Sequence, residues 1–349
     1  MNLRGLGLVA LAALTVGCTS ASSAAPDSTS TTLALSGLPT SASTVPPVTA
    51  APTTTTTVFD LQAIPGRHIG AIPEDETVLC PQAADVPIAG ELLAMPDYPN
   101  RPTSLQRAAD PAAPLLVVFH GQHGCIQNVQ SRSDLDVMYA AAGVHVLWLS
   151  GEPVPTRSWR VNNGCCEPAD TKGINDKPYI EAAMAAARAA GLTSTTVLAI
   201  GVSNGGGMAI TAGCAYPELF TGVVVVAGWI SSSCGRASQS MLAFGGSLDQ
   251  SLGSRTAAGI TDMWRSSVVD CPAEPMIETY EARTTTTWWG CTDNTVVRLV
   301  QLEGVPHVWP KFTFYDMDDD IILFALGKYA TGDWIGDSGV PLGGTPLLP

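Results

Sequence analysis

The chain has 349 residues, of which 46% are hydrophobic and only 14% are charged, and its formal net charge is −14. This length allows one large domain with additional segments, and the apolar fraction suits a globular domain with a large core. The acidic balance argues against a nucleic-acid partner, because binding to phosphates depends on clustered lysine and arginine side chains.

The first eighteen residues have the features of an export signal. Arg4 supplies a positive charge, and the apolar run over residues 6–16 is too short for a comfortable membrane span. The sequence Thr15-Val16-Gly17-Cys18 resembles a bacterial lipobox, which implies that Cys18 carries a lipid and tethers the protein to a cell surface. Since Thr15 replaces the usual leucine, ordinary secretion with cleavage near Ala24-Ala25 stays open.

Composition divides the rest of the chain into three parts. Residues 19–57 are Ser, Thr, Ala and Pro and cannot bury a core, so we expect a disordered stalk. Residues 58–335 form the expected folded domain, and 336–349 form a tail. The tail contains Gly336-Asp337-Ser338-Gly339, a motif of trypsin-like proteases. We treat it as a coincidence, because those proteases have an all-β fold and a different order of catalytic residues.

The folded domain alternates between apolar, β-branched runs and helix-forming runs. Residues 75–82 and 86–93 are early strands or connections. The clearer predicted strands cover 114–119, 144–149, 195–200, 222–227, 241–244 and 296–302, and the predicted helices cover 179–190, 206–216 and 321–329. This alternation indicates an α/β fold with a mostly parallel central sheet flanked by helices.

One motif lies between the strand at 195–200 and the helix at 206–216. Gly201-Val202-Ser203-Asn204-Gly205 matches G-x-S-x-G, the sharp strand-to-helix turn that exposes a nucleophilic serine in α/β-hydrolases. The context of strand, turn and helix is the one that the motif requires. Ser203 is therefore the predicted nucleophile.

The order of residues along the chain limits which acid and which histidine can act with Ser203. In this fold the acid and then the histidine follow the serine, and His307 alone of the five histidines does so. Asp249 follows the predicted strand at 241–244 and is the preferred acid. The other aspartates in the interval lie in a predicted helix or near cysteines: Asp262, Asp270 and Asp293.

These residues have complementary roles in acyl transfer. His307 would take the proton of Ser203, and Asp249 would orient the imidazole and stabilise its charged form. The backbone N–H groups of Asn204 and Gln122 are the predicted donors of the oxyanion hole. Gln122 follows His120-Gly121, but a second His-Gly pair occupies 123–124, so either pair could line the oxyanion pocket.

The motifs also carry a family resemblance. The matching segments are 115–121, 125–128, 164–166, 201–208, 216–220, 245–249, 289–291 and 306–310. As an ordered set they resemble the secreted polyhydroxybutyrate depolymerases and feruloyl esterases, which are relatives of carbohydrate esterase family 1. The resemblance implies an α/β-hydrolase fold and a lid-poor esterase with Ser203, Asp249 and His307 as its catalytic triad.

Aromatic residues near these motifs are candidates for a substrate wall. Trp288 and Trp289 are adjacent, so on extended backbone they point to opposite faces, and one could face the core while the other faces a substrate. Trp309 is a candidate because it lies close to His307 in the sequence. Trp159 and Trp229 are weaker candidates.

The cysteines fit an oxidising compartment. With Cys18 set aside, eight of the nine cysteines remain, which allows up to four disulfides. We predict a bond between Cys271 and Cys291 that tethers the connection from Asp249 to His307. It would either shape one wall of the ester pocket or staple a loop far from the chemistry.

Nothing in the sequence predicts a metal ion or another cofactor. No spacing of His, Cys or carboxylates resembles a zinc site, and no glycine-rich loop fits phosphate binding. An acidic run over 316–320 could suggest calcium, but it is interpreted more simply as the start of the helix at 321–329, where carboxylates favour the positive end of the helix dipole.

Together these features predict an exported serine esterase that is a monomer and contacts a membrane only through a lipid on Cys18. Its expected substrate is a small or polymeric ester of the feruloyl, acetyl-sugar or polyhydroxyalkanoate type. An acyltransferase that uses a sugar or lipid hydroxyl remains an alternative, as does a catalytically inactive binding module on a stalk.

Overall fold

The computed structural model describes residues 61–327, apart from 69, 71–79, 81–85, 153–156, 162–165, 229–233, 252–255 and 313. The packing of the chain divides it into Met1–Thr56 and Thr57–Pro349, and the described residues all belong to the second unit. The expected signal segment with Cys18, the stalk and the C-terminal tail therefore lie outside the described residues, as do Trp229 and Cys165.

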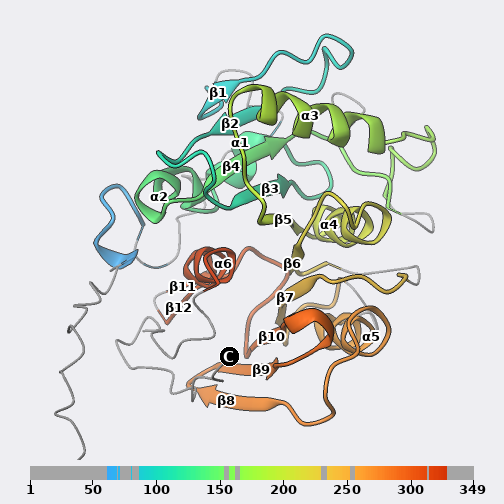
Figure 1. Ribbon diagram of the computed structural model, residues 1–349. Helices are drawn as coiled ribbons and strands as arrows, with labels where there is room; N and C mark the ends of the chain where they lie inside the picture. The colour runs from blue at the N-terminus through green and yellow to red at the C-terminus, as the bar shows by residue number, and fades with distance from the viewer. Residues whose placement is uncertain are drawn as a thin grey trace, which may run out of the picture. The chain divides into compact units, whose positions relative to one another are not determined.

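The described elements alternate between strands and helices along most of the chain (Figure 1). In order they are a 3-10 turn Leu61–Ala63, β1 Glu91–Leu92, β2 Ser104–Gln106, β3 Leu115–Phe119, α1 Ile126–Gln130, α2 Leu135–Ala142, β4 His145–Leu149, α3 Lys177–Ala189, β5 Val197–Val202, α4 Asn204–Ala215, β6 Gly222–Val226, β7 Ser240–Gly246, α5 Ala257–Met263, a π-helical turn Trp264–Val268, β8 Met276–Tyr280, β9 Arg283–Trp288, a 3-10 turn Thr292–Asn294, β10 Val297–Leu302, β11 Lys311–Phe312, β12 Tyr315–Asp316 and α6 Met317–Ala325.

Ten of these strands form one sheet in the order β1-β2-β4-β3-β5-β6-β7-β10-β9-β8. The six central strands, from β4 to β10 in that order, are parallel, and antiparallel strands extend the sheet at both sides. The central strands therefore all end at the same edge. We call it the carboxyl edge, and we call the opposite edge, where these strands begin, the amino edge.

Helices cover both faces of the sheet. Figure 1 shows α3, α4 and α5 on one face and α2 and α6 on the other. All residues of β3, β4 and β6 are buried, as expected for parallel strands that are covered on both sides. Their side chains divide between two apolar clusters, one under each layer of helices. The predicted α/β class is the observed one.

Two elements differ from the expectation. The connection between Asp249 and His307, in which no strand is predicted before residue 296, contains the β8–β9 hairpin, and this hairpin extends the main sheet. Four consecutive threonines lie in β9; threonine is polar but β-branched, so it favours a strand. Helix α6 begins at Met317 rather than at Ile321, and Asp318 and Asp320 are buried within its first turn.

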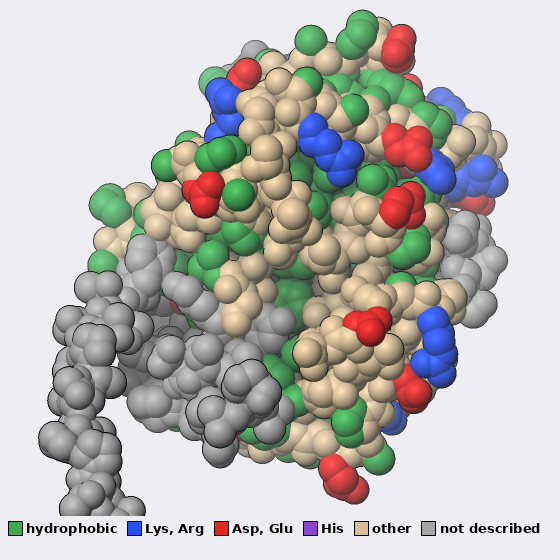
Figure 2. Space-filling model, in the orientation of Figure 1, with side chains coloured by type: hydrophobic (Ala, Val, Ile, Leu, Met, Phe, Trp, Pro, Cys, Tyr) green, Lys and Arg blue, Asp and Glu red, His purple; other side chains and the backbone are tan. Residues whose placement is uncertain are grey.

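The surface carries no large block of one charge on the face that Figure 2 shows, where acidic and basic side chains are interspersed among polar and apolar ones. Within the described residues, no helix is both long enough and apolar enough to cross a membrane.

Candidate active site

Ser203 occupies a strained turn between β5 and α4. Its φ and ψ are 55° and −121°, a conformation that costs a non-glycine residue on the order of 1–3 kcal/mol. The surrounding backbone holds it there, because Ser203 N–H donates to the Val226 oxygen at 2.9 Å and its own oxygen accepts from Gly207 N–H at 3.0 Å. Strain that is stabilised in this way is typical of a nucleophile elbow.

The glycines of the motif allow the turn to be this tight. A Cβ atom on Gly201 would lie 2.1 Å from the carbonyl oxygen of Gly205. A Cβ atom on Gly205 would lie 2.1 Å from the carbonyl oxygen of Phe119, at the end of β3. Real Cβ contacts are never so short, so only glycine lets α4 begin this close to β3 and β5.

Asp249 and His307 form a hydrogen-bonded pair. The Nδ1 atom of His307 lies 2.8 Å from Oδ2 of Asp249, whose side chain is only 4% exposed, while that of His307 is 27% exposed. The other carboxylate oxygen accepts from Ser251 N–H at 3.0 Å. An aspartate in this position keeps the proton of the imidazole on Nδ1, so that Nε2 is free to accept another.

The topology brings the three residues to the carboxyl edge. Ser203 follows β5, Asp249 follows β7 and His307 follows β10, with β6 between β5 and β7. Within the described structure, Ser203 Oγ makes no hydrogen bond to His307. In free enzymes such a contact often becomes short only when substrate is bound.

The two predicted oxyanion donors lie beside Ser203. A Cβ atom placed on Gly121, the residue before Gln122, would lie 3.6 Å from the Cβ of Ser203. Neither Gln122 N–H nor Asn204 N–H donates to a backbone carbonyl in the described part of the chain. Both are therefore free to bind an oxyanion, and it is the first His-Gly pair that lies against the serine.

His120 fixes the direction of the peptide group between Gly121 and Gln122. Its Nε2 accepts from Gly151 N–H at 2.9 Å, so its single proton must lie on Nδ1 and is donated to the Gly121 oxygen at 2.7 Å. Gly124 N–H donates to the same oxygen at 3.0 Å. Because the peptide is trans, Gln122 N–H points the opposite way, away from His120.

Burial keeps His120 in this neutral form. Desolvation lowers the pKa of His120 to about 3, and the nearby guanidinium groups of Arg157 and Arg101 act in the same direction. The hydrogen bond to Gly121 opposes this shift but does not overcome it. The imidazole is thus uncharged wherever a serine esterase works.

Trp159 joins the two sides of the oxyanion site. Its indole N–H donates to the His120 oxygen at 2.9 Å, and its backbone N–H and oxygen bond the side chain of Asn204 at 2.7 and 3.0 Å. Trp159 is fully buried, so it supports the site from beneath and does not face a substrate. No sequence motif indicates this role of Trp159, and the His120-Gly121 pair indicates an oxyanion loop but not that His120 orients its peptide group.

Trp288 and Trp289 lie at the other end of the sheet. Trp288 pairs with Val297, the first residue of β10, so it lies at the amino edge, and it is only 9% exposed and packs in the core. Cys271 and Cys291 are joined by a disulfide next to this edge. The structure does not bring these four residues to Ser203, which supports the alternative of a staple far from the chemistry.

Trp309 lies between His307 and a buried group of charges. It is 7% exposed, and its indole N–H donates to Oδ1 of Asp318 at 3.0 Å. Its contact is thus with α6, and a contact with substrate stays a prediction. We call the group of charges the ionic cluster, and its members are Arg67, Asp134, Lys311, Asp316, Asp318 and Asp319.

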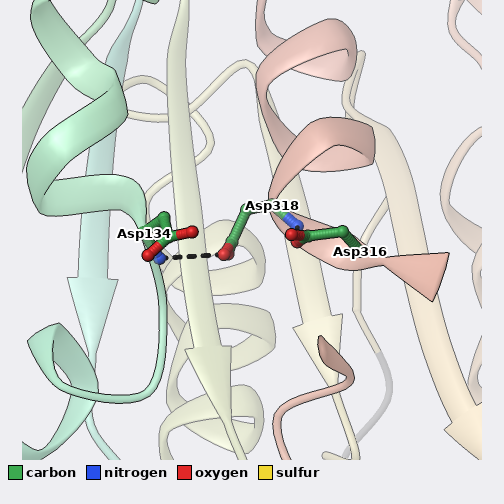
Figure 3. Close-up of side chains that lie close together, drawn as sticks. All are labelled: Asp134, Asp316 and Asp318. Atoms are coloured by element: carbon green, nitrogen blue, oxygen red, sulfur yellow. Dashed lines mark hydrogen bonds between the residues drawn. The ribbon is translucent and has the colours of Figure 1, made fainter. Parts of the chain in front are cut away.

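Three carboxylates of the ionic cluster come close enough to hold a metal ion. Figure 3 shows Asp134, Asp316 and Asp318 pointing toward one another from the start of α2 and the start of α6. The ammonium group of Lys311 lies among them, 2.7 Å from Asp134 and in contact with Asp316. It supplies the positive charge that a metal ion would otherwise supply.

The ionic cluster perturbs the acidity of its members. Burial and the neighbouring Asp316 raise the pKa of Asp318 to about 7. Burial alone would lower the pKa of Lys311, but the charges of Asp318 and Asp316 outweigh it and raise this pKa. Lys311 is therefore a permanent cation in the protein interior.

A cavity of about 530 Å³ lies beside Asp249, over the ends of β7 and β10 and the start of β9. Three acidic residues line it, Asp249, Glu281 and Glu303, and no lysine or arginine is among the described lining residues. The other polar lining residues carry hydroxyl or amide groups: Ser247, Thr256, Thr284 and Gln301.

Two further disulfides join Cys80 to Cys125 and Cys214 to Cys234. Cys125 immediately precedes α1 and follows the two His-Gly pairs, so its bond ties the oxyanion loop to the start of the domain.

Comparisons with known proteins give one curated relative and a structural likeness. No family model matches the chain. A stretch of 125 residues is 31% identical to NocK of Nocardia uniformis subsp. tsuyamanensis, a protein named as an esterase, and covers 34% of this chain. The match covers 34% of NocK as well, so it spans about a third of the length of that relative. The acetyl xylan esterase of Aspergillus awamori matches with a TM-score of 0.53 and 18% identity, over 68% of this chain and 100% of that one.

Proposed function

Because the chain has the α/β-hydrolase fold, we propose that it hydrolyses carboxylic esters through an acyl-enzyme on Ser203. His307 takes the proton of Ser203 as the hydroxyl attacks the ester carbonyl, and Asp249 stabilises the resulting imidazolium. Gln122 N–H and Asn204 N–H bind the oxyanion of the tetrahedral intermediate. His307 then protonates the departing alcohol, and water releases the acid by the same steps in reverse.

One observation carries this proposal. The Asp249–His307 hydrogen bond lies at the same sheet edge as Ser203, which has a strained backbone. Beside Ser203, the N–H groups of Gln122 and Asn204 donate to no described backbone carbonyl. Acyl transfer needs this combination of an oriented base, an exposed nucleophile and preorganised donors. A binding module has no need of it.

The cavity beside Asp249 favours an ester substrate whose alcohol part is uncharged and carries hydroxyl groups. Its carboxylates repel an anionic group, whereas its hydroxyl, amide and carboxylate groups can bond sugar hydroxyls. We therefore place acetylated or feruloylated sugars ahead of an apolar polyester among the substrates. Hydrolysis rates for acetylated xylo-oligosaccharide and for polyhydroxybutyrate will rank the two.

We also propose that the enzyme is exported and held at the cell surface by a lipid on Cys18. The disulfides support an oxidising compartment. Mass spectrometry of the mature N-terminal peptide tests the proposal, because a diacylglyceryl group on Cys18 and cleavage near Ala24-Ala25 give different masses.

The first test of the reaction is Ser203→Ala, assayed with p-nitrophenyl acetate. We expect kcat/KM to fall by several orders of magnitude with the fold retained, because a triad member is lost. Ser266→Ala, which changes an exposed serine on the π-helical turn, should leave kcat/KM unchanged. Activity of Ser203→Ala within about tenfold of the wild type would refute the assignment.

A second test identifies the acid. Asp249→Asn should lose most of the activity, since an amide favours the wrong tautomer of His307. Asp262→Asn is the matched control, because Asp262 is exposed on α5 and, within the described part of the chain, forms an ion pair with Arg265 alone. If Asp262→Asn proved the more damaging of the two, Asp249 would not be the acid.

A further inference from the structure

The segment that carries His307 is held on its upstream side by the loop that carries Asp249. Leu248 N–H donates to the Val305 oxygen at 3.0 Å, and Gly304 N–H donates to the Ser247 hydroxyl at 2.9 Å. These contacts join the ends of β7 and β10. They set the distance between the loop that carries Asp249 and the loop that carries His307. The residues after His307 must be held by other contacts.

On the downstream side the chain enters the ionic cluster within four residues of His307. Trp309 donates its indole N–H to Oδ1 of Asp318, and Met317 N–H donates to the Pro310 oxygen at 3.1 Å. Lys311 then contacts three carboxylates, among them Asp134 at 2.7 Å and Asp318 at 3.4 Å. Both Lys311 and Asp318 are almost completely buried.

The carboxylates that this segment contacts are themselves held by two other parts of the chain. Oδ2 of Asp318 accepts from Asp134 N–H at the start of α2, at 2.9 Å, as the dashed line in Figure 3 shows. Arg67 approaches from the start of the domain and contacts Asp316 at 2.7 Å and Asp319 at 2.6 Å. Asp318, in the first turn of α6, is thus joined directly to the start of α2, and its neighbours Asp316 and Asp319 are joined to Arg67.

We propose that Trp309 and Lys311 are positioning residues of the esterase, which act through Asp318 to hold His307 in place against Asp249. The proposal rests on the proposed function, because it concerns the base of that reaction. Buried ion pairs stabilise a fold little compared with apolar residues of the same size, since desolvation offsets their attraction. The distances and directions within a buried ion pair do, however, allow only one arrangement of the chain. Such precision matters for catalysis, because a displacement of a catalytic group by about 1 Å can lower the rate by about a hundredfold.

The test compares two tryptophans that lose the same kind of bond. Trp309→Phe keeps a ring in the core but removes the donor to Asp318. Trp264→Phe is the matched control, because Trp264 is fully buried and its indole N–H donates to the Gln239 oxygen at 3.0 Å, in the π-helical turn. Both variants should lose thermal stability. Only Trp309→Phe should lose kcat on p-nitrophenyl acetate, by about tenfold or more with KM within about twofold.

A second measurement does not depend on turnover. The Nδ1 proton that His307 shares with Asp249 should give a low-field proton NMR signal, which His307→Gln identifies by its loss. We expect Trp309→Phe to shift or broaden this signal and Trp264→Phe to leave it in place. Lys311→Arg, which keeps the charge, should retain a higher kcat than Lys311→Met. If Lys311→Met does not fold, the comparison of Trp309→Phe with Trp264→Phe tests the proposal without it.

Three outcomes would overturn the proposal. One is a Trp309→Phe enzyme with wild-type kcat, KM and NMR signal, whose only change is in stability. Another is a raised KM with unchanged kcat, which would mean that Trp309 contacts substrate instead. The third is an equal loss of kcat in Trp264→Phe. If the wild type hydrolyses no ester, the proposed function fails, and the NMR comparison still decides whether Trp309 positions His307.

Discussion

At the scale of single residues, the direction of one peptide group depends on the protonation state of His120. A neutral imidazole accepts from Gly151 and donates to the Gly121 oxygen, whereas a charged one could not accept at all. Gln122 N–H is therefore preorganised by a residue that never touches the substrate. His120 is a positioning residue in the proposed reaction.

Removing this imidazole should slow the chemistry. We expect His120→Ala to lower kcat on p-nitrophenyl acetate by roughly tenfold to a hundredfold, because the loss of one oxyanion donor costs at most about a thousandfold. His145→Ala is the control: His145 is equally buried and accepts from Ala108 N–H at 2.9 Å, but it begins β4 at the amino edge. Equal kcat losses in both variants would assign His120 a structural role only.

The lowered pKa of His120 also predicts an acid-sensitive stability. The unfolded chain takes up a proton near pH 6.5 and the folded one only near pH 3, so stability should fall as the pH drops through this window. The slope due to His120 is about 1.4 kcal/mol per pH unit. His120→Asn should lack this contribution, which urea unfolding at pH 6.5, 5.5 and 4.5 would measure. An unchanged slope would mean that His120 is solvated.

At the scale of elements, α4 begins where only glycine fits. Gly205→Ala would force a Cβ atom against β3, so we expect little folded protein and no activity. Gly259→Ala, on the exposed face of α5, meets only Thr256 Oγ1 at 3.8 Å. It should leave stability unchanged or raise it by up to about 1 kcal/mol. Thermal melting of the two variants compares them, and a well-folded, active Gly205→Ala would contradict the described turn.

The elements that the sequence predicts well are those whose signal is local. Runs such as Leu115–Phe119 and Val197–Val202 are apolar and β-branched, and the motif around Ser203 needs a strand before it and a helix after it. The order of serine, acid and histidine then limits the possible triad. Local patterns therefore suffice for the parallel strands and the elbow, and the order along the chain adds the pairing of Asp249 with His307. They do not suffice for the antiparallel β8–β9 hairpin at one side of the sheet.

Features that depend on distant partners could not be predicted. The acidic run before Ile321 looks like a solvated helix start, and its burial becomes explicable only with Arg67 and Lys311. The role of Trp159 depends likewise on the meeting of three loops. In each case the decisive contact joins residues that no periodicity or motif connects.

At the scale of the whole molecule, two of the disulfides differ in their distance from the proposed catalytic residues. The Cys271–Cys291 bond lies by the amino edge, so Cys271→Ser/Cys291→Ser should lower stability by about 3 kcal/mol and leave kcat/KM unchanged. Cys80→Ser/Cys125→Ser should lower kcat as well, because Cys125 follows Gly124, which bonds the Gly121 oxygen. Non-reducing peptide mapping checks the pairings. A loss of activity in the first variant alone would reverse this division.

The ion pair between Arg67 and Asp316 joins residues 249 positions apart, and this separation bears on the order in which the protein can fold. Burying either charge without an opposite one is costly, so we expect the packing around Arg67 to be completed only after α6 has been synthesised. Because a chain is synthesised from its N-terminus, Arg67 is present long before Asp316. A chain that ends before Asp316 would leave part of the positive charge of Arg67 and Lys311 without carboxylate partners, so we expect this domain to fold stably only when α6 is present.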